Sequence, residues 1–317
     1  MPIKIPDKLP AKSILENENI FVMTERRALA QDIRPLKLLI LNLMPTKIVT
    51  ETQLLRKLSN TPLQIEVDFL RMVSHDAKNV DKSHLDTFYE DFEAVHERDY
   101  DGLIVTGAPV ETIDFEKVDY WPELCNVMDW AKLHVHCSLF ICWGAQAALY
   151  HYYGIPKYDL PDKLSGVFEH SIEDTTTRLF RGFDTEFWVP HSRFTEVRAA
   201  DIAESPHLEI LSLSEQAGVF AVKSKDNRSL FITGHPEYDS DTLQLEYDRD
   251  LVRGINPAVP QNYFPGDDTL QKPIVRWKAP AQLLYGNWLN YYVYQSTPYN
   301  LAELASNPGE YCCGEGI

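Results

Sequence analysis

Disulfide pairs, membrane-spanning runs and an excess of basic residues are all missing from this sequence. Its 317 residues include five cysteines, an odd number without a CxxC pair, which argues against a disulfide framework. No run approaches the roughly 20 apolar residues of a membrane span, and the first residues form no apolar signal segment. Lysine and arginine number 30 against 47 acidic residues, and the net charge of −17 repels nucleic-acid phosphates. We therefore expect a cytoplasmic protein without membrane or nucleic-acid partners, in which a local cluster of Lys and Arg still allows an anionic coenzyme to bind.

Common motifs for nucleotides and metals are absent as well. No P-loop and no GxGxxG sequence occurs. His134 and His136 are separated by a single residue and could both ligate a metal. No third ligand has a recognisable spacing, so we expect no metal site.

Apolar runs alternate with helical patterns in the first half of the chain. The predicted strands are residues 38–41, 63–70, 102–106 and 138–142. The predicted helices are residues 50–58, 121–133 and 144–150, and the acidic residues 74–98 indicate loop and surface helix. Uninterrupted runs such as 38–41 are typical of strands buried on both faces, and their alternation with helices indicates a parallel α/β sheet.

The pattern weakens after residue 156. We expect short strands at 167–168 and 187–189, further strands at 208–213, 218–222 and 229–234, helices at 242–252 and 283–294, and a long loop at 254–273 that acts as a lid or cover. The helical spacing of Leu284, Trp288 and Tyr292 indicates core packing or a dimer seam.

The most informative segment is a short apolar run that ends in a cysteine. Residues 138–141 are Ser-Leu-Phe-Ile, Cys142 follows, and residues 144–150 favour a helix. This pattern predicts a strand, a tight turn and a helix, with Cys142 at the corner. Backbone N–H groups and the dipole at a helix N-terminus favour the thiolate, which is the nucleophilic form of cysteine. A cysteine that ends a core strand also serves as a packing residue, so this segment alone leaves both interpretations open.

A second apolar run supplies groups that complement a thiolate. Residues 229–233 lead through Gly234 to His235-Pro236-Glu237, which offers an imidazole base and a carboxylate to orient it. The carboxyl ends of parallel strands meet at one crevice, so we expect Cys142, His235 and Glu237 to converge there.

Three segments resemble the class I glutamine amidotransferase superfamily. Residues 142–146, Cys-Trp-Gly-Ala-Gln, resemble its nucleophile turn, and residues 235–237 are similar to its His-x-Glu pair. Residues 106–109, Thr-Gly-Ala-Pro, resemble the glycine loop beside its oxyanion hole. That superfamily usually has glycine two places before the cysteine, where this chain has Phe140.

A closer resemblance runs from Pro2 to about Tyr299, to the homoserine O-succinyltransferase/O-acetyltransferase family of methionine biosynthesis. The segments that carry it are NIFVM (19–23), LNLMP (41–45), VTGAP (105–109), KLSGV (163–167), PHSR (190–193), TGHPEY (233–238) and NWLNYY (287–292). The resemblance implies an α/β fold with a doubly wound, mostly parallel flavodoxin-like sheet, which agrees with the pattern above. We divide the chain into an N-terminal extension (1–34), a catalytic α/β domain (35–300) and a C-terminal tail (301–317), of which residues 309–317 are expected to be mostly disordered.

The resemblance implies a two-step acyl transfer. Cys142 would take the acyl group from acyl-coenzyme A as a thioester, and the hydroxyl of L-homoserine would then attack it. His235 would remove the hydroxyl proton, while Glu237 holds the imidazole in the required tautomer. The expected substrates are L-homoserine and acetyl-coenzyme A, with no cofactor besides that co-substrate, and we expect a homodimer.

Further site residues come from the turn geometry and from the resemblance. The backbone N–H of Trp143 is expected in the oxyanion hole, with a second donor near Gly107 or Met44. By resemblance, Lys163, Ser192 and Arg249 contact substrate, and Arg249 would bind the carboxylate of homoserine.

Two more cations are candidates for the same crevice. Arg193 follows Ser192, and Lys47 lies just past the first predicted strand. For Lys47, a position in the crevice and a position as an exposed loop lysine are equally compatible with the sequence.

Glu111 bears on the choice of acyl donor. In the family that these segments resemble, glycine at this position accompanies succinyl transfer and glutamate accompanies acetyl transfer. Like charges about 4 Å apart at an effective dielectric near 20 repel by roughly 4 kcal/mol before screening, so a carboxylate here disfavours succinyl. We therefore expect acetyl transfer.

Three alternative functions remain open at this stage. One is succinyl transfer to homoserine. Another is a glutaminase or thiol hydrolase on the same scaffold, with water as acceptor, against which Phe140 argues mildly. The third is a binding or regulatory protein without catalysis, which the intact Cys142, His235 and Glu237 disfavour.

Overall fold

The computed structural model describes residues 3–6, 8–17, 22–24, 34–74, 81–298, 301 and 304. Most of the C-terminal tail, including residues 309–317, lies outside the described residues.

Strands and helices alternate over most of the described chain. The strands are β1 (Ile3–Ile5), β2 (Val22–Thr24), β3 (Leu36–Leu41), β4 (Ile65–Leu70), β5 (Tyr89–Glu90), β6 (Tyr100–Val105), β7 (Val135–Ile141), β8 (Tyr158–Ile172), β9 (Glu186–Glu196), β10 (Leu208–Ser214), β11 (Gly218–Ser224) and β12 (Ser229–Ile232). The α-helices are α1 (Ala11–Asn17), α3 (Lys47–Leu58), α4 (Lys82–Phe88), α5 (Phe92–Val95), α6 (Trp121–His134), α7 (Trp143–Tyr153), α8 (Ala199–Glu204), α9 (Thr242–Val252) and α10 (Lys278–Asn287). Short 3₁₀ turns are η1 (Phe115–Lys117), η2 (Arg178–Phe180) and η3 (Pro265–Asp267), and η4 (Trp288–Tyr294) is a π-helix.

One sheet organises the molecule. Its strands follow the order β2-β1-β4-β3-β6-β7-β12-β11-β10-β8-β9, and β5 pairs with β4. Neighbours are parallel from β2 as far as β12, and antiparallel from β12 to β9. The predicted mostly parallel, doubly wound α/β fold is confirmed, and the N-terminal extension adds β1 and β2 at one edge.

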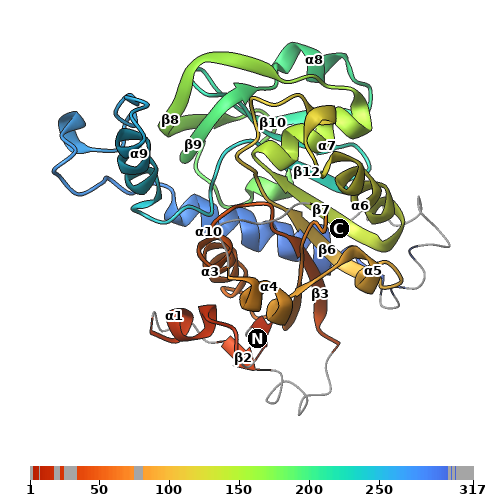
Figure 1. Ribbon diagram of the computed structural model, residues 1–317. Helices are drawn as coiled ribbons and strands as arrows, with labels where there is room; N and C mark the ends of the chain where they lie inside the picture. Colours follow the sequence, from red (N-terminus) through yellow and green to blue (C-terminus); the bar gives the residue numbers. More distant parts are fainter. Residues whose placement is uncertain are drawn as a thin grey trace.

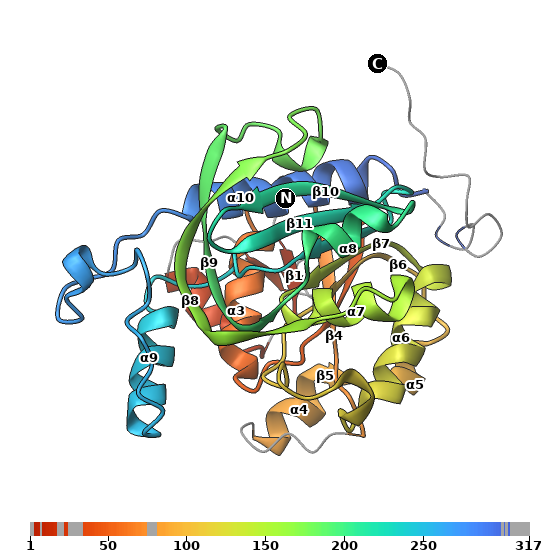
Figure 2. The ribbon, with the colours of Figure 1, turned by 90° about the horizontal axis from the view of Figure 1, so that it is seen from above.

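Helices cover both faces of the parallel half (Figure 1). One core cluster joins side chains of α3, α10 and η4 to one face of the sheet, and a second cluster joins α6, α7 and α8 to the other. Along β3, Leu38 and Ile40 belong to the first cluster and Leu39 and Leu41 to the second. Figure 2 shows α10 along one side of the sheet and α6 and α7 along the other. Because β3 is buried on both faces, its sequence shows no alternation of apolar and polar residues.

The strand order reverses between β3 and β6. From β3 the chain passes to β4 on one side, and it then returns to form β6 and β7 on the other side. In doubly wound sheets such a reversal opens a crevice beyond the carboxyl ends of the two strands. Cys142 follows β7, the strand next to β6, so it lies at this edge of the sheet.

The expectation of short strands near residues 167 and 187 is wrong. β8 has 15 residues and β9 has 11, and the two form a long antiparallel hairpin with a register shift between Asp159 and Leu164. Only the part of β8 around Val167 and Phe168 covers the core, while residues 160–165 are partly or fully exposed. The exposed part has no buried face and contains Pro161, so apolar alternation is absent there.

The last aromatic-rich segment belongs to the core. Its helix starts at Lys278, earlier than predicted, and continues from Trp288 as the π-helix η4. Leu284, Trp288 and Tyr292 are buried in the cluster with α3, which confirms core packing.

The expected loop at 254–273 contains η3. Gln261 bridges to Gly166 of β8, and Tyr263 and Phe264 are buried beside Trp277. These contacts anchor the middle of the segment to the hairpin.

No helix in the described part of the chain has the length and apolar character needed to cross a membrane.

Candidate active site

Cys142 occupies a strained corner between β7 and α7. Its φ of 50° and ψ of −117° are unusual for a residue other than glycine. Its backbone N–H donates to the carbonyl of Ile232 in β12 (2.7 Å), and the carbonyl of Cys142 accepts from Ala145 and Gln146 as helix α7 begins. Strained backbone of this kind concentrates at functional sites, and here it holds the sulfur at the N-terminus of a helix, as the sequence predicted.

Gly144 permits this tight corner. A Cβ placed on Gly144 would lie 2.6 Å from the carbonyl oxygen of Thr106 and 3.0 Å from that of Val105. Only glycine lets α7 pack this closely on the end of β6.

His235 and Glu237 meet as expected. The His235 Nδ1 lies 2.6 Å from Glu237 Oε1, and both side chains are buried. The backbone N–H of His235 donates to Pro190 of β9 (2.8 Å), and the Tyr238 ring stacks on the imidazole with centroids 4.2 Å apart. These contacts fix the position and the tilt of the imidazole ring.

Cys142 and His235 lie close together. A Cβ on Gly107 would lie 3.7 Å from Cys142 Sγ and 3.5 Å from His235 Cε1, so the two side chains face the same small space. Burial alone would lower the pKa of His235, but the charges of Cys142 and Glu237 outweigh burial and hold this pKa well above its ordinary value. The arrangement therefore favours an imidazolium at His235, with the Cys142 sulfur on one side of the ring and the Glu237 carboxyl bonded to Nδ1. The three predicted residues, far apart in the sequence, are brought together.

The predicted glycine loop lies against this group. A Cβ on Gly107 would be 3.2 Å from Cys142 Cβ and 3.5 Å from His235 Cε1. The alternative donor, the N–H of Met44, already donates to Asn42 Oδ1 (3.1 Å). Trp143 is the first residue of α7, where helix N–H groups have no intrahelical acceptor.

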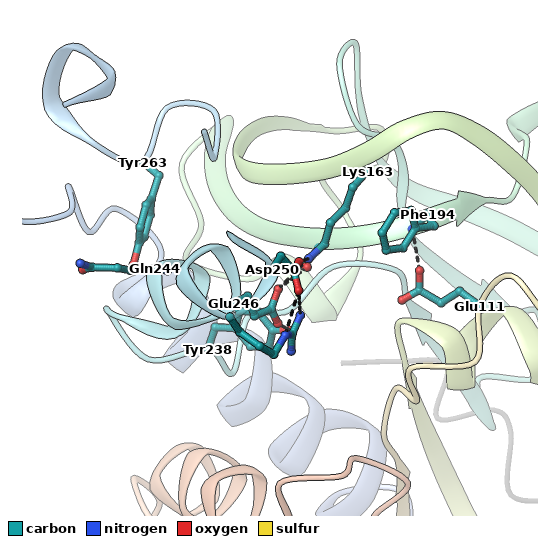
Figure 3. A network of polar contacts seen from close by, with 10 residues as sticks. Glu111, Lys163, Phe194, Tyr238, Gln244, Glu246, Asp250 and Tyr263 are labelled. Atoms are coloured by element: carbon teal, nitrogen blue, oxygen red, sulfur yellow. Dashed lines mark hydrogen bonds and ion pairs between the residues drawn. The ribbon is translucent and has the colours of Figure 1, made fainter. Parts of the chain in front are cut away.

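Lys163 belongs to a second polar cluster, which extends from the hairpin to Glu246 and Asp250 of α9 (Figure 3). Lys163 Nζ lies 2.9 Å from Asp250 Oδ2 and 3.5 Å from Glu246 Oε2. The Ser192 hydroxyl donates to Glu246, and Tyr238 donates to the other Glu246 oxygen (2.8 Å). Since Tyr238 also stacks on His235, this cluster directly adjoins the imidazole.

Arg249 contacts the cluster at the side of the cluster that faces solvent. Its Nε donates to Asp250 Oδ1 (2.9 Å), while 47% of its side chain remains exposed. Sequence reasoning missed Glu246 and Asp250, although their spacing of four residues places both carboxylates on one face of α9.

Glu111 faces the same region from the loop after β6. Its Oε2 accepts the backbone N–H of Phe194 (2.5 Å), and the Phe194 ring lies 5.7 Å from Lys163 Nζ. Burial raises the pKa of the Glu111 carboxyl, and the bond from Phe194 together with the charges of His235, Lys163 and Arg193 partly oppose that rise.

Arg193 and Lys47 are both buried. Arg193 donates to the carbonyls of Thr195 and Ala217 (2.5 Å each), so two of its nitrogens hold the backbone of the hairpin region. Lys47 is the first residue of α3 rather than an exposed loop lysine, and its ammonium donates to the carbonyl of Asn42. Burial lowers the pKa of Lys47 to about 8, although nearby Glu51 opposes this shift.

Phe140 has a structural role at the position where glycine is usual. Its ring stacks on Phe231 of the neighbouring strand β12, with centroids 5.4 Å apart and planes inclined by 11°. It therefore fills the core beneath α7.

Comparison with known proteins agrees with this geometry. The family model described as homoserine O-succinyltransferase matches residues 2–299. The chain belongs to the homoserine O-succinyltransferase family.

The family model is described by succinyl transfer, whereas similar proteins within this family are named for acetyl transfer. A protein of Petrotoga mobilis named homoserine O-acetyltransferase is 60% identical, over 95% of this chain and 97% of its own length. A protein of Desulfitobacterium hafniense with the same name is 55% identical, over 96% of this chain and 100% of its own length.

Solved structures show the wider fold relationship of this homoserine O-succinyltransferase family member. A glutamine amidotransferase from Thermotoga maritima superposes with a TM-score of 0.52 at 12% identity, and covers 81% of this chain and 98% of its own. That likeness concerns the fold alone, and it confirms the predicted resemblance in architecture.

The paired histidines of α6 and β7 have other partners. His134 Nδ1 lies 2.8 Å from Asp99, and His136 Nε2 lies 2.9 Å from Ser296. Among the described residues, no group of three or more His, Cys, Asp or Glu side chains is arranged to hold a metal ion.

Proposed function

We propose that this protein is an acyltransferase that moves an acetyl group from acetyl-coenzyme A to the side-chain hydroxyl of L-homoserine. The observation that carries this proposal is the junction of Cys142, His235 and Glu237 at one strand edge, in a chain 55–60% identical to proteins named homoserine O-acetyltransferase.

In the first step the Cys142 thiolate attacks the thioester carbonyl of acetyl-coenzyme A. The backbone N–H of Trp143 and a donor near Gly107 stabilise the tetrahedral oxyanion, and one such donor is typically worth about 3–4 kcal/mol. The C–S bond to coenzyme A then breaks, His235 supplies a proton to the departing sulfur, and acetyl-Cys142 remains. One thioester replaces another, so the step is nearly balanced in free energy.

In the second step the homoserine hydroxyl attacks acetyl-Cys142. His235, now neutral, takes the hydroxyl proton, and the new C–O bond forms as the bond to Cys142 breaks. The hydrogen bond from Nδ1 to Glu237 leaves Nε2 for this exchange and stabilises the imidazolium that results.

The second polar cluster supplies groups that match a zwitterionic amino acid. Lys163 and Arg249 carry positive charges for the carboxylate, and Glu246 carries a negative charge for the ammonium group. Ser192 and Tyr238 hold Glu246 in place, and Tyr238 also contacts the His235 ring. An acceptor held there would bring its hydroxyl close to the imidazole.

Neither step changes an oxidation state or requires a Lewis acid. We therefore propose that the reaction needs no cofactor besides the co-substrate acetyl-coenzyme A, and that it serves methionine biosynthesis in the cytoplasm.

We also retain the homodimer as a proposal. Figures 1 and 2 show α9 and the segment after it projecting from the body of the molecule. Leu245, Val252 and Ile255 expose apolar surface along this projection, which supports a contact with a second copy.

The experiment is a donor comparison with the acyl-enzyme followed by mass spectrometry. Mixing the purified protein with acetyl-coenzyme A should add one acetyl group at Cys142, and homoserine should then remove it as O-acetylhomoserine. The variant Cys142→Ser should form no thioester adduct. Faster transfer from succinyl-coenzyme A would overturn the choice of donor, and ammonia release from glutamine without acyl transfer would overturn the proposal as a whole.

A further inference from the structure

A cavity of about 400 Å³ lies beside the candidate active site. Its lining comes from the segments after β3 and β4, from α3 and α4, and from the start of α6. The lining residues are Asn42, Leu43, Lys47, Arg71, Met72, Val73, Ser74, Lys82, Leu85, Asp86 and Tyr120. Its volume falls within the range of roughly 300–1,000 Å³ that is typical of small-molecule sites.

The position of the cavity follows from the sheet topology. Asn42 and Leu43 continue directly from β3, and Tyr120 follows the loop that leaves β6. These are the two strands between which the strand order reverses. The cavity is therefore at the place where doubly wound sheets bind ligands, independently of any resemblance in sequence.

Two contacts connect the cavity to Cys142. The backbone N–H of Leu43 donates to Thr106 Oγ1 (2.7 Å), and Thr106 is followed by Gly107, which lies against the Cys142 side chain. On the far wall, the Tyr120 ring packs edge-on against the indole of Trp143, the residue after the nucleophile, with centroids 6.1 Å apart. The Thr106–Gly107 loop and the pair of Tyr120 and Trp143 thus link the cavity lining to the immediate neighbours of Cys142.

The lining is cationic although the chain carries a net charge of −17. Lys47, Arg71 and Lys82 contribute three positive groups against one carboxylate, Asp86. Arg71 is fixed in place because its Nε donates to Asp91 (2.6 Å) and its Nη1 to Asp86 (2.9 Å). Lys82 has an exposed side chain at the start of α4. Leu43, Met72, Val73 and Leu85 give the same cavity apolar surface.

We propose that this cavity binds the coenzyme A portion of the acyl donor, with its phosphates at Lys82 and Arg71 and its pantetheine arm along the apolar wall toward Gly107. The inference rests on the proposed function, and it adds a donor site whose lining shares no residue with the cluster of Lys163 and Glu246. A polyanion with an uncharged arm, in which methyl and methylene groups alternate with amides, matches a cavity that presents cations in one part and apolar side chains in another.

The test measures binding of free coenzyme A by isothermal titration calorimetry, with no catalytic step required. Lys82→Glu should raise the Kd of coenzyme A by about tenfold, because one attractive charge becomes repulsive beside the phosphates. It should leave the Kd of pantetheine, which has no phosphate, unchanged. The Kd of the wild-type protein should rise with added salt, and that dependence should be weaker in Lys82→Glu.

Two further variants show whether a change in affinity comes from the charge at Lys82, from the shape of the cavity or from the net charge of the whole protein. Val73→Trp changes a valine that is 62% exposed at the cavity, so it should narrow the cavity without disturbing the core and weaken both coenzyme A and pantetheine. Lys225→Glu makes the same charge change in the exposed turn before β12, at the amino ends of the parallel strands and away from the cavity at their carboxyl ends, and should bind both ligands like the wild type.

The outcomes distinguish this inference from the proposed function. Equal coenzyme A affinity in Lys82→Glu and Lys225→Glu, or no binding by the wild type, would overturn the donor site even if acetyl transfer to homoserine is observed. Loss of coenzyme A binding in Lys82→Glu, in a protein that transfers no acetyl group to homoserine, would support the site and overturn the proposed function.

Discussion

At the scale of single residues, burial and a few partners decide what each candidate can do. Cys142 and His235 are both buried, and the neighbouring Cys142 and Glu237 raise the pKa of His235 against the opposing effect of burial. Arg193 is equally buried, and two of its nitrogens donate to the backbone carbonyls of Thr195 and Ala217. Glu111 is half-buried and lies beside Phe194 and Lys163, so its charge can be tested against what the neighbouring space accepts.

Glu111→Gly should shift the donor preference toward succinyl-coenzyme A. The substitution removes a carboxylate that would face the free carboxylate of a succinyl group, a repulsion of about 4 kcal/mol before screening. Because screening reduces that figure, we expect the ratio of kcat/KM for succinyl-coenzyme A to that for acetyl-coenzyme A to rise by at least about tenfold, which corresponds to about 1.4 kcal/mol.

Steady-state kinetics with both donors measures this ratio. Glu116→Gly, at an exposed glutamate in the turn η1, is the matched control and should leave the ratio unchanged. An unaltered ratio in Glu111→Gly would mean that this carboxylate does not face the acyl group.

At the scale of elements, the geometry of the candidate active site depends on how closely α7 packs on the end of β6. The strand, the corner and the helix around Cys142 are local in sequence, but Thr106 and Val105 set the distance at which the helix can begin. The imidazole comes from the end of β12, which is held to β7 by parallel pairing from Ser229 to Ile232. Small shifts between these elements therefore change the relation of sulfur to imidazole.

Gly144→Ala should lower both stability and activity. Its Cβ would lie 2.6 Å from the Thr106 carbonyl, so α7 must move away from β6 and carry Cys142 with it. Overpacking of this kind typically costs about 1–3 kcal/mol, and we expect a lower melting temperature together with a lower kcat.

The control is Gly286→Ala, within α10. A Cβ there would meet no atom within 4 Å, so this variant should gain roughly 0.5–1 kcal/mol from helix propensity and keep its activity. Thermal unfolding and steady-state assays of both variants check the pair. Wild-type kcat in Gly144→Ala would show that this close contact does not position the nucleophile.

At the scale of the whole molecule, the fold places several histidines where they cannot easily carry charge. Burial, with a smaller contribution from Arg228, lowers the pKa of His136 from 6.5 to about 4. Burial also lowers the pKa of His170 to about 3 and that of its neighbour His191 well below the ordinary value. The Nε2 atoms of His170 and His191 lie 3.1 Å apart, so this pair forms a neutral hydrogen bond inside the fold.

Stability should fall as the pH is lowered through the window from 6.5 to about 4. In that window the unfolded chain binds a proton at each of these histidines and the folded chain does not. Each histidine therefore lowers the free energy of unfolding by up to about 1.4 kcal/mol for every pH unit of acidification. His136→Asn keeps a hydrogen-bonding partner for Ser296 and removes one titrating group, so its melting temperature should fall less steeply with pH than that of the wild type.

Melting temperatures measured across that window check the comparison. His207→Asn, at an exposed histidine, should follow the wild-type pH dependence. Identical slopes for His136→Asn and the wild type would contradict the assignment of acid sensitivity to buried neutral histidines.

Much of the fold and the three central site residues were predictable from local pattern. Uninterrupted apolar runs such as Leu38 to Leu41 predict the buried strands. The corner at Cys142 is predicted by an apolar run that is followed directly by small, helix-forming residues. The strand-end rule then brings Cys142 and His235 to one edge, because all strands of a parallel sheet point the same way.

Tertiary structure decided the features that depend on distant partners. Lys163 meets Asp250 and Glu246 across 87 and 83 residues, and no local spacing reveals such a contact. The exposed half of the β8–β9 hairpin has no buried face and therefore no periodic signal, and Lys47 is buried only because α3 packs on the sheet. The sequence by itself determined the corner that holds Cys142 and the class of fold, since both rest on neighbouring residues, while the cluster of Lys163 and Glu246 and the cavity lined by Lys47 and Lys82 arise only where separate elements pack together.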